Sequence, residues 1–230
     1  MIIAIDGPAA SGKGTIGRKL AAKLGLAFLD TGSIYRAATK RILEQRISPF
    51  NVAAVINAIK GLSIEDTTAD GLRSPEISNV APLIAKIPEV REMLIHLQRD
   101  FAHCPPEGMR GSVLDGRDIA TTICPEAEVK LFITATTLAR AKRRHRELLA
   151  QGIHTSFRAV HRDLRRRDEE DLSRPTSPLK VAEGAVVLDT TDMSPDEAFE
   201  RALAIVSRGR PELSCYPRLA RPQALNRREG

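Results

Sequence analysis

The stretch IIAIDGPAASGKGT, residues 2–15, decides the fold of this chain. An apolar run rich in isoleucine stops at Gly7, and Gly12 and Lys13 follow in the spacing of a phosphate-binding loop. Glycines let the backbone wrap close to phosphate oxygens, so that its N–H groups can point at them. A helix that begins near Lys13 adds the positive end of its dipole, and the lysine adds a mobile charge. We therefore expect a strand, a phosphate loop and a helix, in that order.

The residue after the lysine departs from the general pattern, in which Ser or Thr follows directly. Here Gly14 comes next and Thr15 follows, so we expect any contact of the hydroxyl with Mg²⁺ one residue later. We also expect the Lys13 side chain to face solvent in the free protein. An ordinary glycine turn is the alternative, but the amphipathic pattern of residues 13–24 supplies the helix that a phosphate site requires.

Length and composition favour a single α/β domain with insertions. The chain has 230 residues, of which 42% are hydrophobic and only 3% aromatic, so its core must be aliphatic. No apolar run approaches the roughly 18 residues of a membrane span, and the first residues lack a signal-peptide pattern. Three widely spaced cysteines without a CxxC pair predict ordinary thiols, no cysteine metal site and a cytoplasmic location.

The positive charge is concentrated rather than spread. The net charge is +6, and the basic residues gather at 140–146, at 158–174 and in the last part of the chain. Basic helices are usually solvated faces; beside a phosphate loop, the alternative is that some arginines converge on phosphates. Binding of RNA is a third reading, but stacking aromatics are scarce, so we expect no nucleic-acid partner.

Strand and helix patterns alternate along the chain. Short apolar runs predict buried parallel strands at residues 2–6, 27–29, 112–114, 129–134 and 185–188. Amphipathic patterns predict helices at residues 13–24, 33–45, 89–102, 138–150 and 195–206. The alternation predicts a doubly covered parallel sheet. We expect one domain over residues 1–206, with its core in 1–46, 89–151 and 185–206, a helical insertion at 47–88, a mobile flap at 152–184 and a flexible tail at 207–230.

Polar residues follow the second and third predicted strands. Asp30 to Arg36 form a binding edge of an open sheet, or, alternatively, Thr31 or Ser33 caps the helix and Arg36 is solvated. At the end of the third strand, Asp115 suits Mg²⁺ or its waters. Arg117 and Asp118 then project into the same crevice, or form a local turn with an internal ion pair.

Two further sets of charged residues come from helical patterns. Arg167, Asp171 and Arg174 fall at i, i+4 and i+7, so one helix face presents two guanidinium groups and a carboxylate, suited to phosphate and ribose hydroxyls. The alternative is a solvated helix end with local pairs. Arg91, alone on a helix, is by itself more typical of a surface residue.

Together these motifs resemble the bacterial cytidylate kinases of the nucleoside-monophosphate kinase family. The matching pieces are GPAASGKGT at 7–15, DTGSIYR at 30–36, VR at 90–91 with QR at 98–99, DGRD at 115–118 and RDEEDLSR at 167–174. They occur in the family's order and span residues 1 to about 206. The resemblance implies a five-stranded parallel core, a monophosphate-binding insertion at 47–88, a closing lid at 152–184, and transfer of phosphate from ATP to CMP or dCMP with Mg²⁺.

The resemblance also implies roles for individual residues. The catalytic residues would be Lys13, Arg117, Arg167 and Arg174. Those that bind ATP would be Gly7, Pro8, Ala9, Ala10, Ser11, Gly12, Lys13, Gly14, Thr15, Arg143 and Arg144. Those that bind CMP would be Thr31, Tyr35, Arg36, Arg91, Arg117, Asp118, Arg167, Asp171 and Arg174. Thr15, with Asp115 as a second candidate, would hold Mg²⁺ through water.

The chain departs from the family's pattern in two places. The insertion is short, so the small sheet expected there is reduced to residues 62–66. Pro82 stands where some members have a serine that contacts the base, so selection among CMP, dCMP and UMP stays open. A kinase of another monophosphate or small metabolite is the nearest alternative function. We expect a monomer that acts in pyrimidine nucleotide metabolism.

Overall fold

Five short apolar runs form one parallel sheet. The computed structural model of the chain describes residues 1–209. Its strands are β1 (Ile2–Asp6), β2 (Ala27–Asp30), β3 (Ser112–Gly116), β4 (Val129–Thr134) and β5 (Val186–Asp189). They lie in the order β2-β3-β1-β4-β5 with every pair parallel. The predicted α/β class and parallel sheet are confirmed, and each predicted strand lies within two residues of the observed one.

The central strand supplies both halves of the core. All five residues of β1 are buried. Successive side chains of a strand point to opposite faces, so Ile2 and Ala4 pack in one apolar cluster while Ile3 and Ile5 pack in another. Helices close each cluster on its outer side, which is why β1 reads as a continuous apolar run rather than an alternating one.

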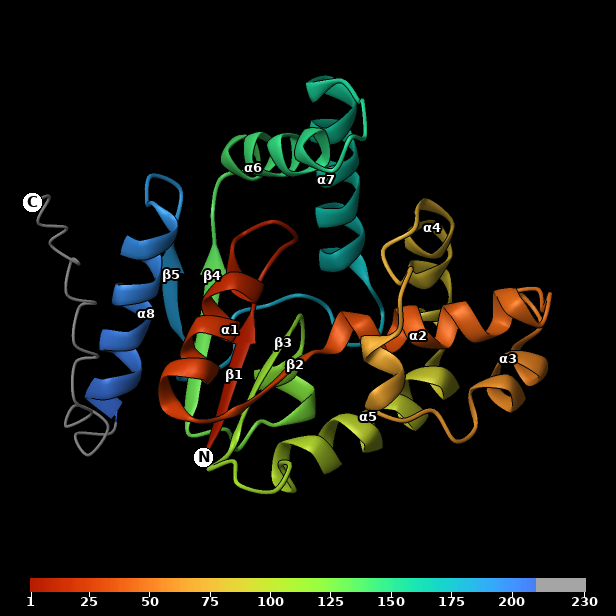
Figure 1. Cartoon of the computed structure of the whole chain (residues 1–230), viewed down its shortest axis with the longest axis horizontal. Coiled ribbons are helices and arrows are strands. Elements are labelled where there is room, and N and C mark those ends of the chain that lie inside the picture. Colours follow the sequence, from red (N-terminus) through yellow and green to blue (C-terminus); the bar gives the residue numbers. More distant parts are fainter. Residues whose placement is uncertain (210–230) are drawn as a thin grey trace, which may run out of the picture.

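Eight α-helices and two shorter turns surround the sheet. The helices are α1 (Lys13–Leu24), α2 (Thr31–Glu44), α3 (Val52–Ile59), α4 (Pro75–Ile84), α5 (Pro88–His103), α6 (Thr137–Ala150), α7 (Phe157–Ser173) and α8 (Pro195–Gly209), with a 3₁₀ turn η1 (Glu65–Thr68) and a π turn η2 (Ile119–Ile123), all within residues 1–209. Figure 1 shows α8 beside α1 at one end of the molecule and α2 to α5 at the other. None of the helices in this described part combines the length and apolar character needed to cross a membrane.

One predicted boundary and one predicted strand need correction. α8 continues to Gly209, beyond the predicted end at residue 206, and the rest of the predicted flexible tail lies outside the described residues. The predicted strand remnant at 62–66 is wrong, because the described insertion at 47–88 holds α3, η1 and α4 and no strand. Asp66 closes this segment into a turn, since its Oδ2 atom accepts from the Ser63 N–H at 2.8 Å and pairs with Arg41 of α2 at 2.8 Å.

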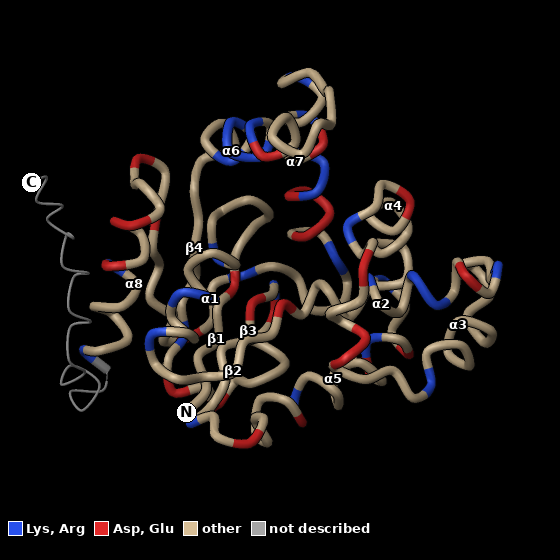
Figure 2. Tube along the Cα trace, viewed as in Figure 1, with Lys and Arg blue, Asp and Glu red and all other residues tan. Residues whose placement is uncertain are grey.

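The helical pair α6 and α7 lies over the ends of β1 and β4 (Figure 1). Thr136 and Ser156 cap the two helices, each accepting a hydrogen bond from the N–H three residues on. The pair has a small apolar cluster of its own in Ala141, Val160 and Leu164, against which Ala9 and Ala10 also pack. Basic residues gather along α6, and α7 carries both signs of charge (Figure 2). The segment predicted as a flap is thus largely one helix; its mobility stays a prediction.

Candidate functional site

A large cavity opens where the strands end, the usual binding edge of an open parallel sheet. It has a volume of about 1140 Å³ and lies between the residue 9–15 loop, the turn after β3, helix α4 and the pair α6–α7. Its lining includes these predicted residues: Ala9, Ala10, Ser11, Gly12, Lys13, Gly14, Thr15, Thr31, Tyr35, Arg36, Arg91, Asp115, Arg117, Asp118, Arg143, Arg144, Arg167, Asp171 and Arg174. The fold therefore brings together motifs that are up to about 160 residues apart in the chain.

Gly7 and Pro8, the first two residues of the loop motif, are not part of this lining. Gly7 has a φ of +147°, and a Cβ atom there would lie 2.0 Å from the carbonyl oxygen of Ile133 on β4. Its role in the structure is therefore to let the chain leave β1 against the neighbouring strand, because any side chain would collide with that strand. The loop that faces the cavity begins at Ala9.

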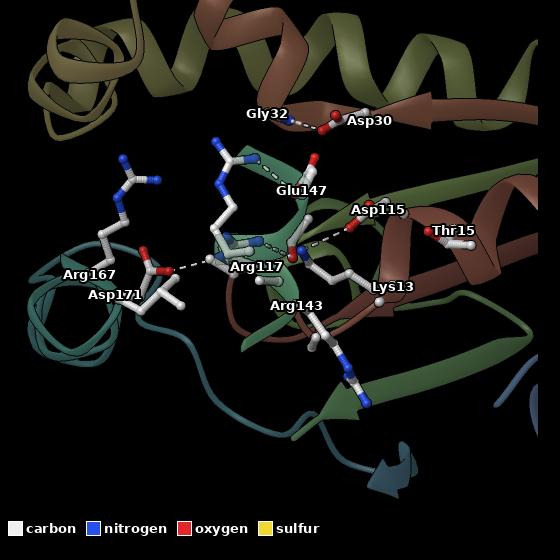
Figure 3. A pocket seen from close by; sticks show the side chains of 18 of the residues that line it. Lys13, Thr15, Asp30, Gly32, Asp115, Arg117, Arg143, Glu147, Arg167 and Asp171 are labelled. Atoms are coloured by element: carbon white, nitrogen blue, oxygen red, sulfur yellow. Dashed lines mark hydrogen bonds and ion pairs between the residues drawn. The ribbon is translucent and has the colours of Figure 1, made fainter. Parts of the chain in front are cut away.

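Lys13 is buried beside a carboxylate. Its Nζ atom lies 3.4 Å from Oδ1 of Asp115, and only 8% of the residue is exposed, so the expectation that it faces solvent is wrong (Figure 3). The reason is the sheet order: β3 pairs with β1, which places Asp115 beside the loop. Burial, followed by the charge of Arg117, lowers the pKa of Lys13. Burial likewise raises the pKa of Asp115.

The same carboxylate explains the glycine after the lysine. A Cβ atom on Gly14 would lie 3.0 Å from Oδ2 of Asp115, tighter than ordinary contact. Ser or Thr at this position would crowd the Asp115 side chain, and the hydroxyl comes instead from Thr15, one residue later. A glycine after the lysine thus fits the position of the Asp115 carboxylate against the start of α1.

The oxygen donors near the loop fit magnesium. Within residues 1–209, no group of three or more His, Cys, Asp or Glu side chains could hold a metal ion by itself. Mg²⁺ prefers one or two protein oxygens and completes its shell with water and substrate phosphates. The Asp115 carboxylate and the Thr15 hydroxyl, both lining the cavity, have the chemistry that such an ion needs.

Asp30, the last residue of β2, organises the next part of the site. Its Oδ1 atom accepts from the Gly32 N–H at 3.1 Å and caps α2, so the alternative in which Thr31 or Ser33 is the cap is wrong. The Thr31 hydroxyl instead donates to the carbonyl of Asp115 at 2.9 Å, joining the ends of β2 and β3.

Two arginines approach the other oxygen of Asp30. The Nη1 atom of Arg36 on α2 lies 3.8 Å from Oδ2 of Asp30, and the Nη2 atom of Arg73 in the insertion lies 3.3 Å from the same oxygen. Burial lowers the pKa of Arg36, and the positive charges of Arg73 and Arg117 lower it further. The negative charge of Asp30 acts in the opposite direction and raises it. Arg73 escaped the sequence analysis because no motif surrounds it in the insertion.

Arg117 and Asp171 join the turn after β3 to α7. The Nε atom of Arg117 donates to Oδ2 of Asp171 at 2.7 Å (Figure 3). Burial by itself would lower the pKa of Arg117. The carboxylates of Asp171 and Asp115 have the larger effect, so the pKa of Arg117 is raised. The alternative of a turn with an internal Arg117–Asp118 pair is wrong, because each residue has a partner elsewhere.

Arg174 lies just past the end of α7. The helix ends at Ser173, so the prediction that Arg167, Asp171 and Arg174 share one helix face is wrong for Arg174, whose backbone has left the helical region. Its Nη2 atom still lies 3.3 Å from Oδ1 of Asp171. The Nε and Nη2 atoms of Arg174 are buried and form no hydrogen bond with any group in residues 1–209. The contact of Nη2 with Asp171 is thus an ion pair without hydrogen-bond geometry. Buried guanidinium donors that form no hydrogen bond are unusual, and here they adjoin a cavity.

Arg91 and Asp118 form a buried ion pair on the far side of the cavity. Arg91 is 3% exposed and Asp118 is 7% exposed, so the surface alternative for Arg91 is wrong. Arg91 also donates to the carbonyl of Ala85 at 3.3 Å and lies 5.9 Å from the ring centre of Tyr35, while its buried Nε atom has no hydrogen-bond partner in the described chain. The pair therefore presents both a donor and a carboxylate.

Asp6, the last residue of β1, holds the turn that carries this carboxylate. It is 2% exposed, and its two oxygens accept from the N–H groups of Ile119 and Ala120, each at 2.8 Å. Burial raises the pKa of Asp6 to about 6, although the two backbone hydrogen bonds act in the opposite direction. Sequence reasoning missed this role, since the residue reads simply as the end of a strand.

Three arginines of the basic helix α6 lie at or beside the cavity, and each has a different partner. Arg143 donates to the hydroxyl of Thr190 at 3.0 Å and to its carbonyl, and Arg144 pairs with Glu147 at 2.9 Å; both line the cavity. Arg140 is buried against the phosphate loop and α7, a contact that the sequence analysis did not anticipate.

Several known proteins that are similar in sequence to this chain have the same description. A family model described as cytidylate kinase matches residues 3–208. A cytidylate kinase of Paramagnetospirillum magneticum is 49% identical over 89% of this chain and 97% of its own length. Those of Methylocella silvestris and Rhodospirillum rubrum are 49% and 47% identical, each over 90% of this chain and over 94% and 97% of their own lengths.

Proposed function

The chain belongs to the cytidylate kinase family and phosphorylates CMP with ATP, and we propose that it transfers the phosphoryl group directly, with Mg²⁺, and also accepts dCMP. The observation that carries the proposed site is that many cationic side chains line one cavity, and that Arg174, one of them, has buried donors that form no hydrogen bond. Those that we assign to the phosphates are Lys13, Arg36, Arg117, Arg167 and Arg174. Such a group suits substrates that together carry four phosphates.

ATP would bind along the loop at residues 9–15. The backbone N–H groups there and the start of α1 favour phosphate oxygens, and Lys13 would leave Asp115 in part to follow the transferred group. Arg143 and Arg144, on the α6 side of the cavity, would lie near the rest of the nucleotide. Thr15 and Asp115 would hold Mg²⁺ through water, and the ion would help to neutralise the negative charge of the phosphates.

CMP would bind on the opposite side, with its phosphate toward Arg36, Arg117 and Arg174. An oxygen of this phosphate is already nucleophilic, so no strong base is needed. A new bond forms from it to the γ-phosphorus, the bond from that phosphorus to the ADP oxygen breaks, and ADP leaves. Arginines stabilise the charge on the equatorial oxygens as it passes, and the cover of α6 and α7 limits water.

The cytosine would meet the Arg91–Asp118 pair. Asp118 can accept from the amino group at N4, and Arg91 can donate to N3 or O2. Each residue already orients the other, which preorganises both for a base. Pro82 lines the same cavity and offers no side-chain hydrogen bond. Asp171 would accept from a ribose hydroxyl while it holds Arg117.

A substrate panel tests this proposal. ADP release is measured with CMP, dCMP, UMP and AMP, with Mg²⁺ and after chelation of divalent ions. We expect turnover of CMP and dCMP that requires the metal ion, and much weaker turnover of UMP and AMP. Activity on CMP that survives chelation contradicts the role of Mg²⁺, and no activity on dCMP contradicts the wider substrate range.

The monomeric state, cytoplasmic location and division into core, insertion and lid stay predictions.

A further inference from the structure

Arg140, near the start of α6, uses every donor that its side chain has. Its Nε atom donates to the carbonyl of Ala135 at 2.9 Å. Its Nη1 atom donates to the carbonyl of Ala9 at 3.2 Å and to Oδ1 of Asp168 at 2.9 Å. Its Nη2 atom donates to the hydroxyl of Thr137 at 2.9 Å and to Oδ2 of Asp168 at 2.6 Å. A guanidinium group has five N–H donors, so all of them are satisfied.

These five acceptors come from separate parts of the molecule. Ala9 belongs to the phosphate loop, Ala135 and Thr137 to the junction of β4 and α6, and Asp168 to the middle of α7. Arg140 is 3% exposed and the side chain of Asp168 is 19% exposed, so their bidentate pair is partly shielded from water. Only a planar fork can meet this set of acceptors at once. The side chain therefore joins α7 to the phosphate loop through one rigid group.

The phosphate loop needs such support. Ala10 has a φ of +59°, a left-handed conformation that is unfavourable for alanine. The preceding carbonyl, that of Ala9, is the one that Arg140 binds. The side chains of Ala9 and Ala10 also pack against the cluster of Val160 and Leu164 on α7, an apolar contact independent of the hydrogen bonds.

We propose that Arg140 is a positioning residue that fixes α7 relative to the phosphate loop. Asp168 directly follows Arg167 and stands three residues before Asp171. Arg140, with its five hydrogen bonds, forms a clamp that therefore contacts α7 between the two side chains assigned to the substrates. The inference rests on the proposed function, in which Arg167 and Asp171 act on phosphate and ribose. Arg140 touches neither substrate; it sets the distance between the group that binds ATP and the groups that act on CMP.

The test is a double-mutant cycle of Arg140→Lys and Asp168→Asn, with Arg166→Lys as the control. Lysine retains the charge but cannot reach five acceptors in a plane. The control makes the same exchange on α7, at an exposed arginine that pairs with Asp163 at 2.5 Å. Turnover of CMP is measured at saturating ATP and CMP, below the unfolding transition of each variant, and is expressed per ATP-binding site counted by titration.

We expect each single variant to lower kcat by about 10- to 100-fold, the scale of a misplacement of about 1 Å. The double variant should be no worse than the poorer single one, because both remove the same clamp. The control should stay within about 2-fold of wild type, as expected for an exposed pair. A kcat per site equal to that of wild type, or a double variant equal to the product of the singles, would overturn the inference.

Two further measurements distinguish a failure of the proposed function, or of the variant to fold, from a failure of the inference about Arg140. Wild-type turnover of CMP in the same assay is the test of the proposed function, and only the comparison among variants concerns Arg140. Where Arg140→Lys does not fold, Thr137→Val removes one acceptor of the clamp and retains the ion pair. We expect a loss of a few-fold in kcat, the scale of one lost hydrogen bond, and an unchanged kcat would also overturn the inference.

Discussion

The Nζ atom of Lys13 lies 3.4 Å from Oδ1 of Asp115, and both side chains are buried where β3 meets the phosphate loop. The lysine that would follow the transferred phosphoryl group is thus held by a carboxylate that is also a candidate for magnesium. Removal of either charge leaves the other buried and unpaired, which is costly in a protein interior.

Lys13→Met should therefore affect both activity and stability. We expect kcat to fall by about 100-fold or more, since a charge aligned with the transition state is lost. The free energy of unfolding should fall by about 3 kcal/mol, because Asp115 loses its partner. In Lys13→Met/Asp115→Asn, stability should recover in part while activity does not. Chemical denaturation and steady-state kinetics measure the two effects; full activity in the single variant contradicts the role of the lysine.

Arg174→Ala should affect the substrate and not the fold. The buried Nε and Nη2 atoms of Arg174 form no hydrogen bond in the described residues. Asp171, which lies 3.3 Å from Nη2, keeps its ion pair with Arg117 in the variant, so little stability is lost. We expect kcat/KM for CMP to fall by about 100-fold, equivalent to about 3 kcal/mol, the upper scale of a charge-assisted hydrogen bond. Arg165→Ala, on the exposed side of α7, is the matched control. A large drop in Tm with unchanged kinetics would make Arg174 a structural residue.

Asp171→Asn should distinguish ribose from deoxyribose. The carboxylate pairs with Arg117 and Arg174, so some loss is expected with every acceptor. If Asp171 also accepts from a ribose hydroxyl, kcat/KM should fall further for CMP than for dCMP, by about 5- to 10-fold, the scale of one hydrogen bond. The measurement is the ratio of the two kcat/KM values in wild type and variant. Equal losses would limit Asp171 to holding the arginines.

Asp118→Asn should weaken the preference for CMP over UMP. A carboxylate accepts from the cytosine amino group and repels the uracil O4 atom, whereas an amide can turn its NH₂ group toward that oxygen. The variant retains the shape of the pair with Arg91. We expect the ratio of kcat/KM for CMP to that for UMP to shrink by about 10-fold or more. An unchanged ratio means that the base is read elsewhere.

Asp6 should make stability depend on pH. Its pKa in the folded protein is about 6, above its ordinary value of 3.8, because burial disfavours the charge. The native state therefore holds the proton more tightly, and the associated stability is present below about pH 4 and is lost as the pH rises through 6. A shift of about two pH units corresponds to up to about 3 kcal/mol.

The matched variant is Asp6→Asn, which cannot titrate. Between pH 4 and 7, the unfolding free energy of wild type should fall relative to that of the variant. The comparison cancels the pH dependence of groups that the two proteins share. Denaturant unfolding at four pH values gives this difference. A difference that does not change with pH contradicts the raised pKa of Asp6.

The sheet and most helices could be predicted because their signals are local. The apolar run of β1 and the spacing of Gly7, Gly12 and Lys13 are visible in one short window. The strand at 62–66, which was expected from the family resemblance, has no such local signal. A single carboxylate, Asp66, instead closes that segment by contacts with Ser63 and with the distant Arg41.

The pairing of charged side chains could not be predicted, because it depends on which strands lie side by side. Nothing near Lys13 in the chain indicates that Asp115 will bury it, and this follows only from the contact of β3 with β1. The helix α6 carries several arginines with similar neighbours, and only the packing of α7 selects Arg140. Arg174 was assigned to a helix face because its spacing is helical, although the helix ends one residue earlier.

The position of β1 has a consequence for the order of folding. It is the first strand in the chain and the middle one in the sheet, and its two neighbours, β3 and β4, begin more than 100 residues later. Contacts of such long sequence separation form slowly, because much chain entropy is lost before they are made. Gly7 packs on Ile133 of β4, so the phosphate loop takes its shape only once that strand has docked. Nucleotide affinity should therefore arise late in refolding and report the native state rather than an early intermediate.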